Sequence, residues 1–135
     1  MAKTAGFRRW TTKMRILLVD DEAEYLNILK KRMGRRNMEV TGAGSGSEAI
    51  AILRAKDFDV AVVDLKMEDM DGIEVLKVFK KMVPDMPVII LTGHGSQKAA
   101  REGMACGAYD YLVKPCDLSE LLDKVRKAAE KRPGA

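Results

Sequence analysis

Acidic, hydroxyl and amine side chains follow apolar runs of this sequence at the points where the runs end. They are Asp20 and Asp21 after "LLV", Asp64 after "VAVV", Thr92 after "PVIIL", and Lys114 after "YLV". Three carboxylates held together suit a hard divalent cation such as Mg²⁺, which prefers oxygen ligands. A lysine and a hydroxyl beside them can hold a phosphoryl oxygen. These are the parts of a phosphoryl-transfer site, and Asp64, which ends the most apolar run, is the candidate nucleophile.

The apolar runs also predict the framework that would bring these side chains together. Short runs that are apolar throughout are typical of strands buried on both faces of a parallel sheet, and here they alternate with segments of helical periodicity. The expected strands are 14–20, 38–43, 58–64, 87–92 and 108–113, and the expected helices are 22–33, 47–56 (with Ser47 as N-cap), 72–83, 96–107 and 118–132. This alternation predicts a doubly wound, three-layer α/β domain with five parallel strands and five helices. Ligands of such sheets bind at the carboxyl ends of the strands, where the acids, Thr92 and Lys114 stand.

Composition narrows the class of protein. A chain of 135 residues with 47% hydrophobic residues fits one globular domain. The net charge of +4 is accounted for by residues 1–13, which contain four basic residues and no acid. The rest is balanced, so we expect no direct nucleic-acid binding. No apolar run is long enough to span a membrane and no secretory signal precedes the domain, so a cytoplasmic protein is expected. Cys106 and Cys116 lack the spacing of a zinc or redox pair.

Four segments together resemble one known family. They are "LLVDDE" (17–22), "VVDLKMEDMDG" (62–72), "VIILTGHGS" (88–96) and "GAYDYLVKP" (107–115), in register over residues 14–131. Their order and spacing are similar to those of the receiver domain of bacterial two-component response regulators, such as single-domain chemotaxis receivers. The resemblance implies a flavodoxin-like three-layer sandwich with strand order 2-1-3-4-5. It divides the chain into a basic, flexible N-terminal extension (1–13), a receiver domain (14–131) and a short tail (132–135).

The resemblance also implies roles for the residues at the strand ends. Asp64 matches the phosphoacceptor. Asp20, Asp21 and Asp64, with the backbone carbonyl of Lys66, match the groups that hold Mg²⁺. Thr92 and Lys114 match the hydroxyl and amine that contact the phosphoryl group.

Further positions match groups that respond to phosphorylation or tune it. Thr92 and Tyr111 match the switch pair, and Lys114–Pro115 matches a peptide bond that is cis in the family. Lys66 and His94 match positions that influence the lifetime of the phosphoryl group. Two departures stand out: Glu68 follows Met67 where the family often has proline, and Cys116 replaces the usual aromatic residue after "KP".

As a receiver, the chain would be a signalling switch that catalyses only its own phosphorylation and dephosphorylation. The donor would be a sensor histidine kinase or a histidine phosphotransfer protein. The output would be a changed surface on the fourth helix, fifth strand and final helix, bound by a downstream effector or by a second copy of the chain. Two alternatives remain open: a receiver excised from a longer transcription regulator, and a Mg²⁺-dependent phosphatase. The phosphatase would be expected to have D-x-D at the nucleophile, where this chain has Lys66 in the third position.

Overall fold

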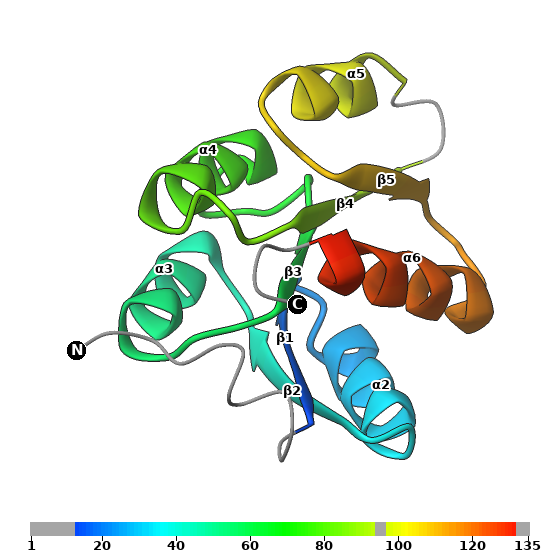
Figure 1. The fold of residues 1–135 in the computed structure, drawn as a ribbon. Helices are drawn as coiled ribbons and strands as arrows, with labels where there is room; N and C mark the ends of the chain where they lie inside the picture. The colour runs from blue at the N-terminus through cyan, green and yellow to red at the C-terminus, as the bar shows by residue number, and fades with distance from the viewer. Residues whose placement is uncertain (1–12, 94–96, 132–135) are drawn as a thin grey trace.

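The computed structural model describes residues 13–93 and 97–131 as one five-stranded parallel sheet with helices between the strands (Figure 1). The strands are β1 (Met14–Val19), β2 (Met38–Ala43), β3 (Val60–Asp64), β4 (Val88–Thr92) and β5 (Asp110–Val113). The helices are α2 (Ala23–Gly34), α3 (Gly46–Ala55), α4 (Gly72–Met82), α5 (Gln97–Ala105) and α6 (Leu118–Lys131). The strand order is β2-β1-β3-β4-β5. The predicted fold class and strand order are therefore confirmed.

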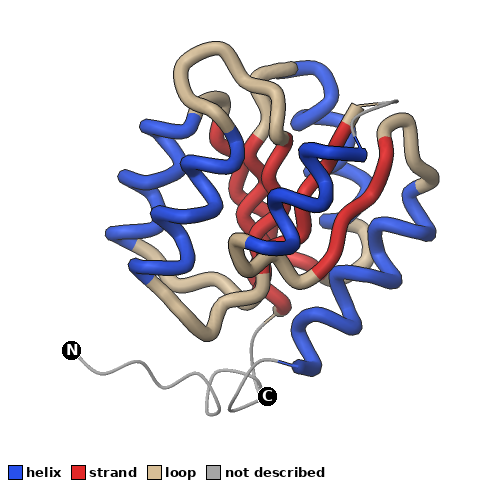
Figure 2. The backbone as a smooth tube through the Cα atoms, turned by 90° about the horizontal axis from the view of Figure 1, so that it is seen from above, coloured by secondary structure: helices blue, strands red, loops and turns tan. Residues whose placement is uncertain are grey.

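The sheet is the middle layer of three. Helices α2 and α6 cover one face and α3, α4 and α5 cover the other (Figure 1), and Figure 2 shows the strands enclosed between helices. Every residue of β3 and β4 is buried. Successive side chains of a strand point to opposite faces. The continuous apolar runs are explained by this sandwich, because both faces of the central strands need apolar side chains.

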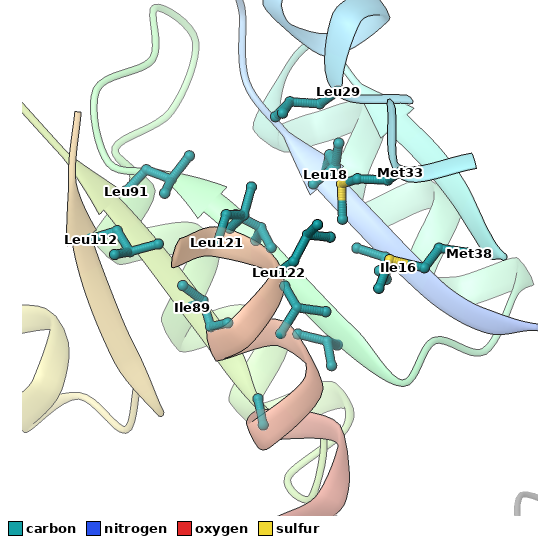
Figure 3. Packing of buried hydrophobic residues seen from close by; sticks show 14 of the residues in the cluster. Ile16, Leu18, Leu29, Met33, Met38, Ile89, Leu91, Leu112, Leu121 and Leu122 are labelled. Carbon is teal, nitrogen blue, oxygen red and sulfur yellow. The ribbon is translucent and has the colours of Figure 1, made fainter. Parts of the chain in front are cut away.

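Alternate residues of β1 supply the two hydrophobic cores. Ile16 and Leu18 belong to the core under α2 and α6, whereas Leu17 and Val19 belong to the core under α3 and α4. Figure 3 shows Leu121 and Leu122 of α6 packed among side chains of the strands and of α2. Each fully buried aliphatic side chain contributes roughly 1.5–3 kcal/mol relative to an exposed one, so both cores hold the strand ends firmly in place.

Local details differ from expectation at a few places. The N-cap of α3 is Ser45, whose hydroxyl accepts a hydrogen bond from the Glu48 amide at 3.1 Å, so the predicted Ser47 cap is wrong. Both serines precede the same apolar stripe, and the sequence pattern could not choose between them. The third strand begins at Val60 rather than at Phe58.

Part of the predicted chain organisation lies outside the described residues. Apart from Lys13, the expected N-terminal extension falls in residues 1–12, and the expected tail is residues 132–135. Within residues 13–93 and 97–131, no helix combines the length and the apolar character needed to cross a membrane.

Candidate functional site

Strand register brings the predicted site residues to one edge of the sheet. Val19 of β1 pairs with Val63 of β3, so the residues that follow them, Asp20 and Asp64, emerge side by side. On the other side of β3, Thr92 of β4 pairs with Val113 of β5, which places Thr92 beside the residue before Lys114. The convergence of these groups at the carboxyl edge, predicted from the sequence, is thus produced by parallel pairing.

The three carboxylates form a compact group, which we name the acidic cluster: Asp20, Asp21 and Asp64. One oxygen from each lies within 4.8 Å of the others. Asp20 and Asp64 are only 2% and 5% exposed, whereas Asp21 is exposed. Burial raises the pKa of Asp20 despite a hydrogen bond from the Glu22 amide, and repulsion from Asp64 raises it further. Negative charge is therefore concentrated where water cannot fully solvate it.

The ammonium of Lys114 partly compensates this charge. Its Nζ lies 3.2 Å from Asp20 Oδ2, 3.2 Å from Glu22 Oε1 and 3.3 Å from Asp64 Oδ2. Burial alone would lower the pKa of Lys114, but the carboxylates of Asp20 and Asp64 and the hydrogen bonds to Glu22 and Asp20 raise it above its ordinary value. The lysine is therefore fully charged at neutral pH, and three acids share its single positive charge.

The two residues predicted to form the switch lie on β4 and β5, and the predicted cis bond follows β5. Thr92 is buried, and its hydroxyl donates to the Leu112 carbonyl at 3.5 Å. The Lys114 amide donates to the Thr92 carbonyl at 2.7 Å, and the Lys114–Pro115 bond is cis. Tyr111 is 41% exposed on β5. The Thr92 hydroxyl is thus directed at β5 rather than at the acidic cluster.

The loop between β3 and α4 (65–71) borders the acidic cluster. The Lys66 amide donates to Asp64 Oδ1 at 3.1 Å, and the Glu68 amide donates to Asp21 Oδ2 at 3.2 Å. Most of the loop lines an open cleft of about 1040 Å³, together with Asp21, Asp64, Thr92 and Lys114. His94, the other predicted tuning residue, lies outside the described residues.

Two residues at this site were not predicted as site residues. Glu22 is one of the three acids that contact Lys114, and the Tyr25 ring lies under the same ammonium, 4.9 Å from Nζ to the ring centroid. Burial raises the pKa of Tyr25 to about 12, and the neighbouring Cys116 contributes to this rise. Glu22 could have been predicted as a site residue, because it directly follows Asp21 in the sequence. Tyr25 gave no such signal in the sequence, because its contact with Lys114 depends on how the first turn of α2 meets the segment after β5 in the folded chain.

The donor set suits Mg²⁺. Three carboxylates offer hard oxygen ligands, and Asp21 is open to the cleft, which leaves room for water and a phosphoryl oxygen in the coordination sphere. Two buried carboxylates beside a single ammonium leave an excess of negative charge that a divalent cation would neutralise. The acidic cluster could therefore hold a metal ion.

Comparison with known proteins places this chain in a family. The sequence matches the response regulator receiver domain over residues 16–126. It is 39% identical over 116 residues to the transcriptional regulatory protein ZraR of Salmonella typhimurium, covering 86% of this chain and 26% of that protein. It is 37% identical over 118 residues to the photosynthetic apparatus regulatory protein RegA of Cereibacter sphaeroides, covering 87% of this chain and 64% of that protein. The chain thus spans about a quarter of the length of ZraR.

Solved structures give the same result. A CheY-like response regulator receiver domain protein from Methanospirillum hungatei superimposes with a TM-score of 0.85 at 31% identity, covering 89% of this chain and 96% of that one. A receiver domain protein from Clostridium thermocellum superimposes with a TM-score of 0.83 at 35% identity, covering 87% and 95%. From the family match, the shared fold and the identities of 31–39%, the chain belongs to the response regulator receiver domain family.

Proposed function

We propose that Asp64 accepts a phosphoryl group from a phosphohistidine of a sensor histidine kinase or a histidine phosphotransfer protein. The observation that carries this proposal is the position of Asp64, beside the other carboxylates of the acidic cluster and 3.3 Å from the ammonium of Lys114. It also lines the open cleft, so a donor can approach it. The membership of the chain in the receiver domain family also supports phosphorylation of Asp64.

In this reaction an oxygen of Asp64 forms a bond to phosphorus as the phosphorus–nitrogen bond of the donor breaks. The imidazole leaves with the electron pair of that bond and takes up a proton. Bound Mg²⁺, held by the acidic cluster and the Lys66 carbonyl, would neutralise charge on the phosphoryl oxygens. Lys114 Nζ, 3.3 Å from Asp64 Oδ2, would hold one phosphoryl oxygen as a point charge.

Phosphorylation of Asp64 would change the positions of Thr92 and Tyr111. The Thr92 hydroxyl, which now donates to the Leu112 carbonyl, would turn to donate to a phosphoryl oxygen. Tyr111, exposed on β5, would follow, and the face formed by α5, β5 and α6 would change in its affinity for a partner. The partner would be a downstream effector or a second copy of the chain. Lys66 and His94 would tune the lifetime of the phosphorylated state.

The direct test is incubation with Mg²⁺ and acetyl phosphate, followed by intact mass measurement. We expect a gain of one phosphoryl group in the wild-type chain and none in Asp64→Ala. The matched control is Asp123→Ala, on the exposed surface of α6, which should gain the group normally. Hydrolysis of added phosphomonoesters without a stable adduct would contradict the proposal and favour the phosphatase alternative.

A second proposal is that this receiver domain is part of a longer protein. The chain spans about a quarter of the length of ZraR, and ZraR and RegA are both described as regulatory proteins. This favours a receiver that controls a longer transcription regulator. The mass of the protein expressed from its native gene distinguishes the two cases, since a product of 15.0 kDa would contradict the longer form.

A further inference from the structure

The loop 65–71 is tied to α3 by one side chain. The carboxylate of Asp69 accepts hydrogen bonds from the Gly46 amide at 3.0 Å and from the Ser47 amide at 3.2 Å, and the Ser47 hydroxyl donates to it at 3.0 Å. The two amides belong to the first turn of α3, where backbone donors have no partner within the helix. These hydrogen bonds lower the pKa of Asp69, so the anchor is ionised at neutral pH.

The preceding residue of the loop is tied to the acidic cluster. The amide of Glu68 donates to Asp21 Oδ2, and the amide of Lys66 donates to Asp64 Oδ1. Neighbouring residues, Glu68 and Asp69, therefore connect the acidic cluster to the N-terminus of α3. The Glu68 contact depends on the absence of proline at this position, because proline has no amide hydrogen to donate.

The loop 65–71 is also packed closely against the start of α3. A Cβ placed on Gly46 would lie 2.9 Å from Met70 Cβ and 2.8 Å from Val75 Cγ2. The start of α3 thus touches the residue after Asp69 as well as α4. A shift of the loop away from α3 would break the hydrogen bonds of Asp69 and also open this contact.

We propose that Asp69 is a positioning residue that preorganises the acidic cluster for Mg²⁺. Asp69 fixes the loop on α3. The fixed loop holds the Glu68 amide against Asp21 and the Lys66 backbone beside Asp64. Asp69 is not itself a metal ligand, because its carboxylate accepts hydrogen bonds from the first turn of α3. The inference rests on the proposed function, which puts Mg²⁺ in the cluster. Without the anchor, the loop would have to be ordered when the metal binds, and the entropy of that ordering would weaken binding.

The test is calorimetric titration of the chain with MgCl₂ in the absence of any phosphodonor. Removal of groups that orient metal ligands weakens metal binding by about 10–100-fold, and we expect Asp69→Ala to lie at the lower end, about tenfold. Asp69→Asn should be intermediate, because its amide oxygen can still accept one hydrogen bond. At saturating Mg²⁺ the phosphorylation rate of Asp69→Ala should approach that of the wild-type chain, since the reacting groups are intact.

Ser45→Ala is the matched control. Ser45 caps the same end of α3 through the Glu48 amide but does not bind the loop. Urea unfolding should show that both alanine variants are folded and destabilised, whereas Mg²⁺ affinity should fall in Asp69→Ala alone. An equal loss of affinity in Ser45→Ala, or unchanged affinity in Asp69→Ala, would overturn the positioning role. A wild-type chain that binds no Mg²⁺ would instead contradict the proposed function on which this role depends.

Discussion

Lys114 Nζ lies 3.3 Å from Asp64 Oδ2, although the two residues are 50 positions apart in the sequence. The contact joins the end of β3 to the segment after β5 across the end of β4. It means that the proposed phosphoacceptor already has a cation beside it before any metal binds. Whether this cation stabilises the fold, the reaction or both can be measured.

Lys114→Gln should lower the free energy of unfolding at pH 7 by about 1–3 kcal/mol, because buried carboxylates lose a charged hydrogen-bond partner. The pKa of Lys114 is raised above 10.5, so its contribution is fully present below that pH and is lost only as pH rises through the folded-state pKa. Urea unfolding with and without Mg²⁺ checks this. The deficit should shrink with Mg²⁺, since the metal replaces the missing positive charge. A deficit unaffected by Mg²⁺ would argue against metal binding at the cluster.

Asp20→Asn should stabilise the metal-free fold at pH 7 by about 1 kcal/mol while weakening Mg²⁺ binding. The folded-state pKa of Asp20 is raised above 3.8, so the proton favours the folded state. This stabilisation is fully present below pH 3.8 and is lost as pH rises through the folded-state pKa. The advantage of the variant should therefore be largest at neutral pH and diminish in acid. Urea unfolding across this pH range is the measurement, and a variant that is less stable than wild type at pH 7 contradicts the prediction.

Gly72→Ala should destabilise the fold by roughly 1–3 kcal/mol, because the new methyl group would overpack backbone that cannot easily move. A Cβ at Gly72 would lie 2.6 Å from the Asp64 carbonyl oxygen and closer still to Leu65 Cα. Phosphorylation should slow as well, since the end of β3 must shift. Gly34→Ala is the control: nothing lies within 4 Å of its Cβ position, and alanine should stabilise the end of α2 by about 0.5–1 kcal/mol. Similar thermal stability of the two variants would refute this reasoning.

Tyr25→Leu should weaken the placement of Lys114 and destabilise the fold by about 0.5–2 kcal/mol, because the ammonium lies 4.9 Å above the aromatic ring. Tyr25→Phe keeps the ring and loses only the hydroxyl group. It should therefore stay close to wild type in stability and in phosphorylation rate with acetyl phosphate. If the phenylalanine and leucine variants behave alike, the ring face has no role.

Most of the fold and the centre of the site could be predicted because both follow from local pattern. Continuous apolar runs indicated strands buried on two faces, and the residues that end these runs had to meet at one edge of a parallel sheet. This reasoning placed Asp20, Asp64, Thr92 and Lys114 correctly at that edge. The family resemblance supplied roles that pattern alone could not give.

Other features depend on tertiary packing that leaves no local signature. The hydrogen bonds of Asp69 to α3 join positions more than 20 residues apart, and the Tyr25 ring meets Lys114 although the two residues lie on α2 and after β5. On α4, Val75 is buried whereas Val78 is only half-buried, although helical periodicity allows either valine to face the core. The serine that caps α3 was also ambiguous, because Ser45 and Ser47 both precede the same apolar stripe.

The unequal anchoring of the helices has a consequence for local opening of the protein. Helix α6 buries Leu121, Leu122, Val125 and two alanines, whereas the buried residues of α5 are Ala100 and Gly103. Small side chains remove little apolar surface from water, so α5 should unfold at a lower free energy than the rest of the sandwich. Its amide hydrogens should exchange with solvent long before those of β3 and β4. The proposed output face would then contain the segment of the fold that is easiest for a partner to remodel.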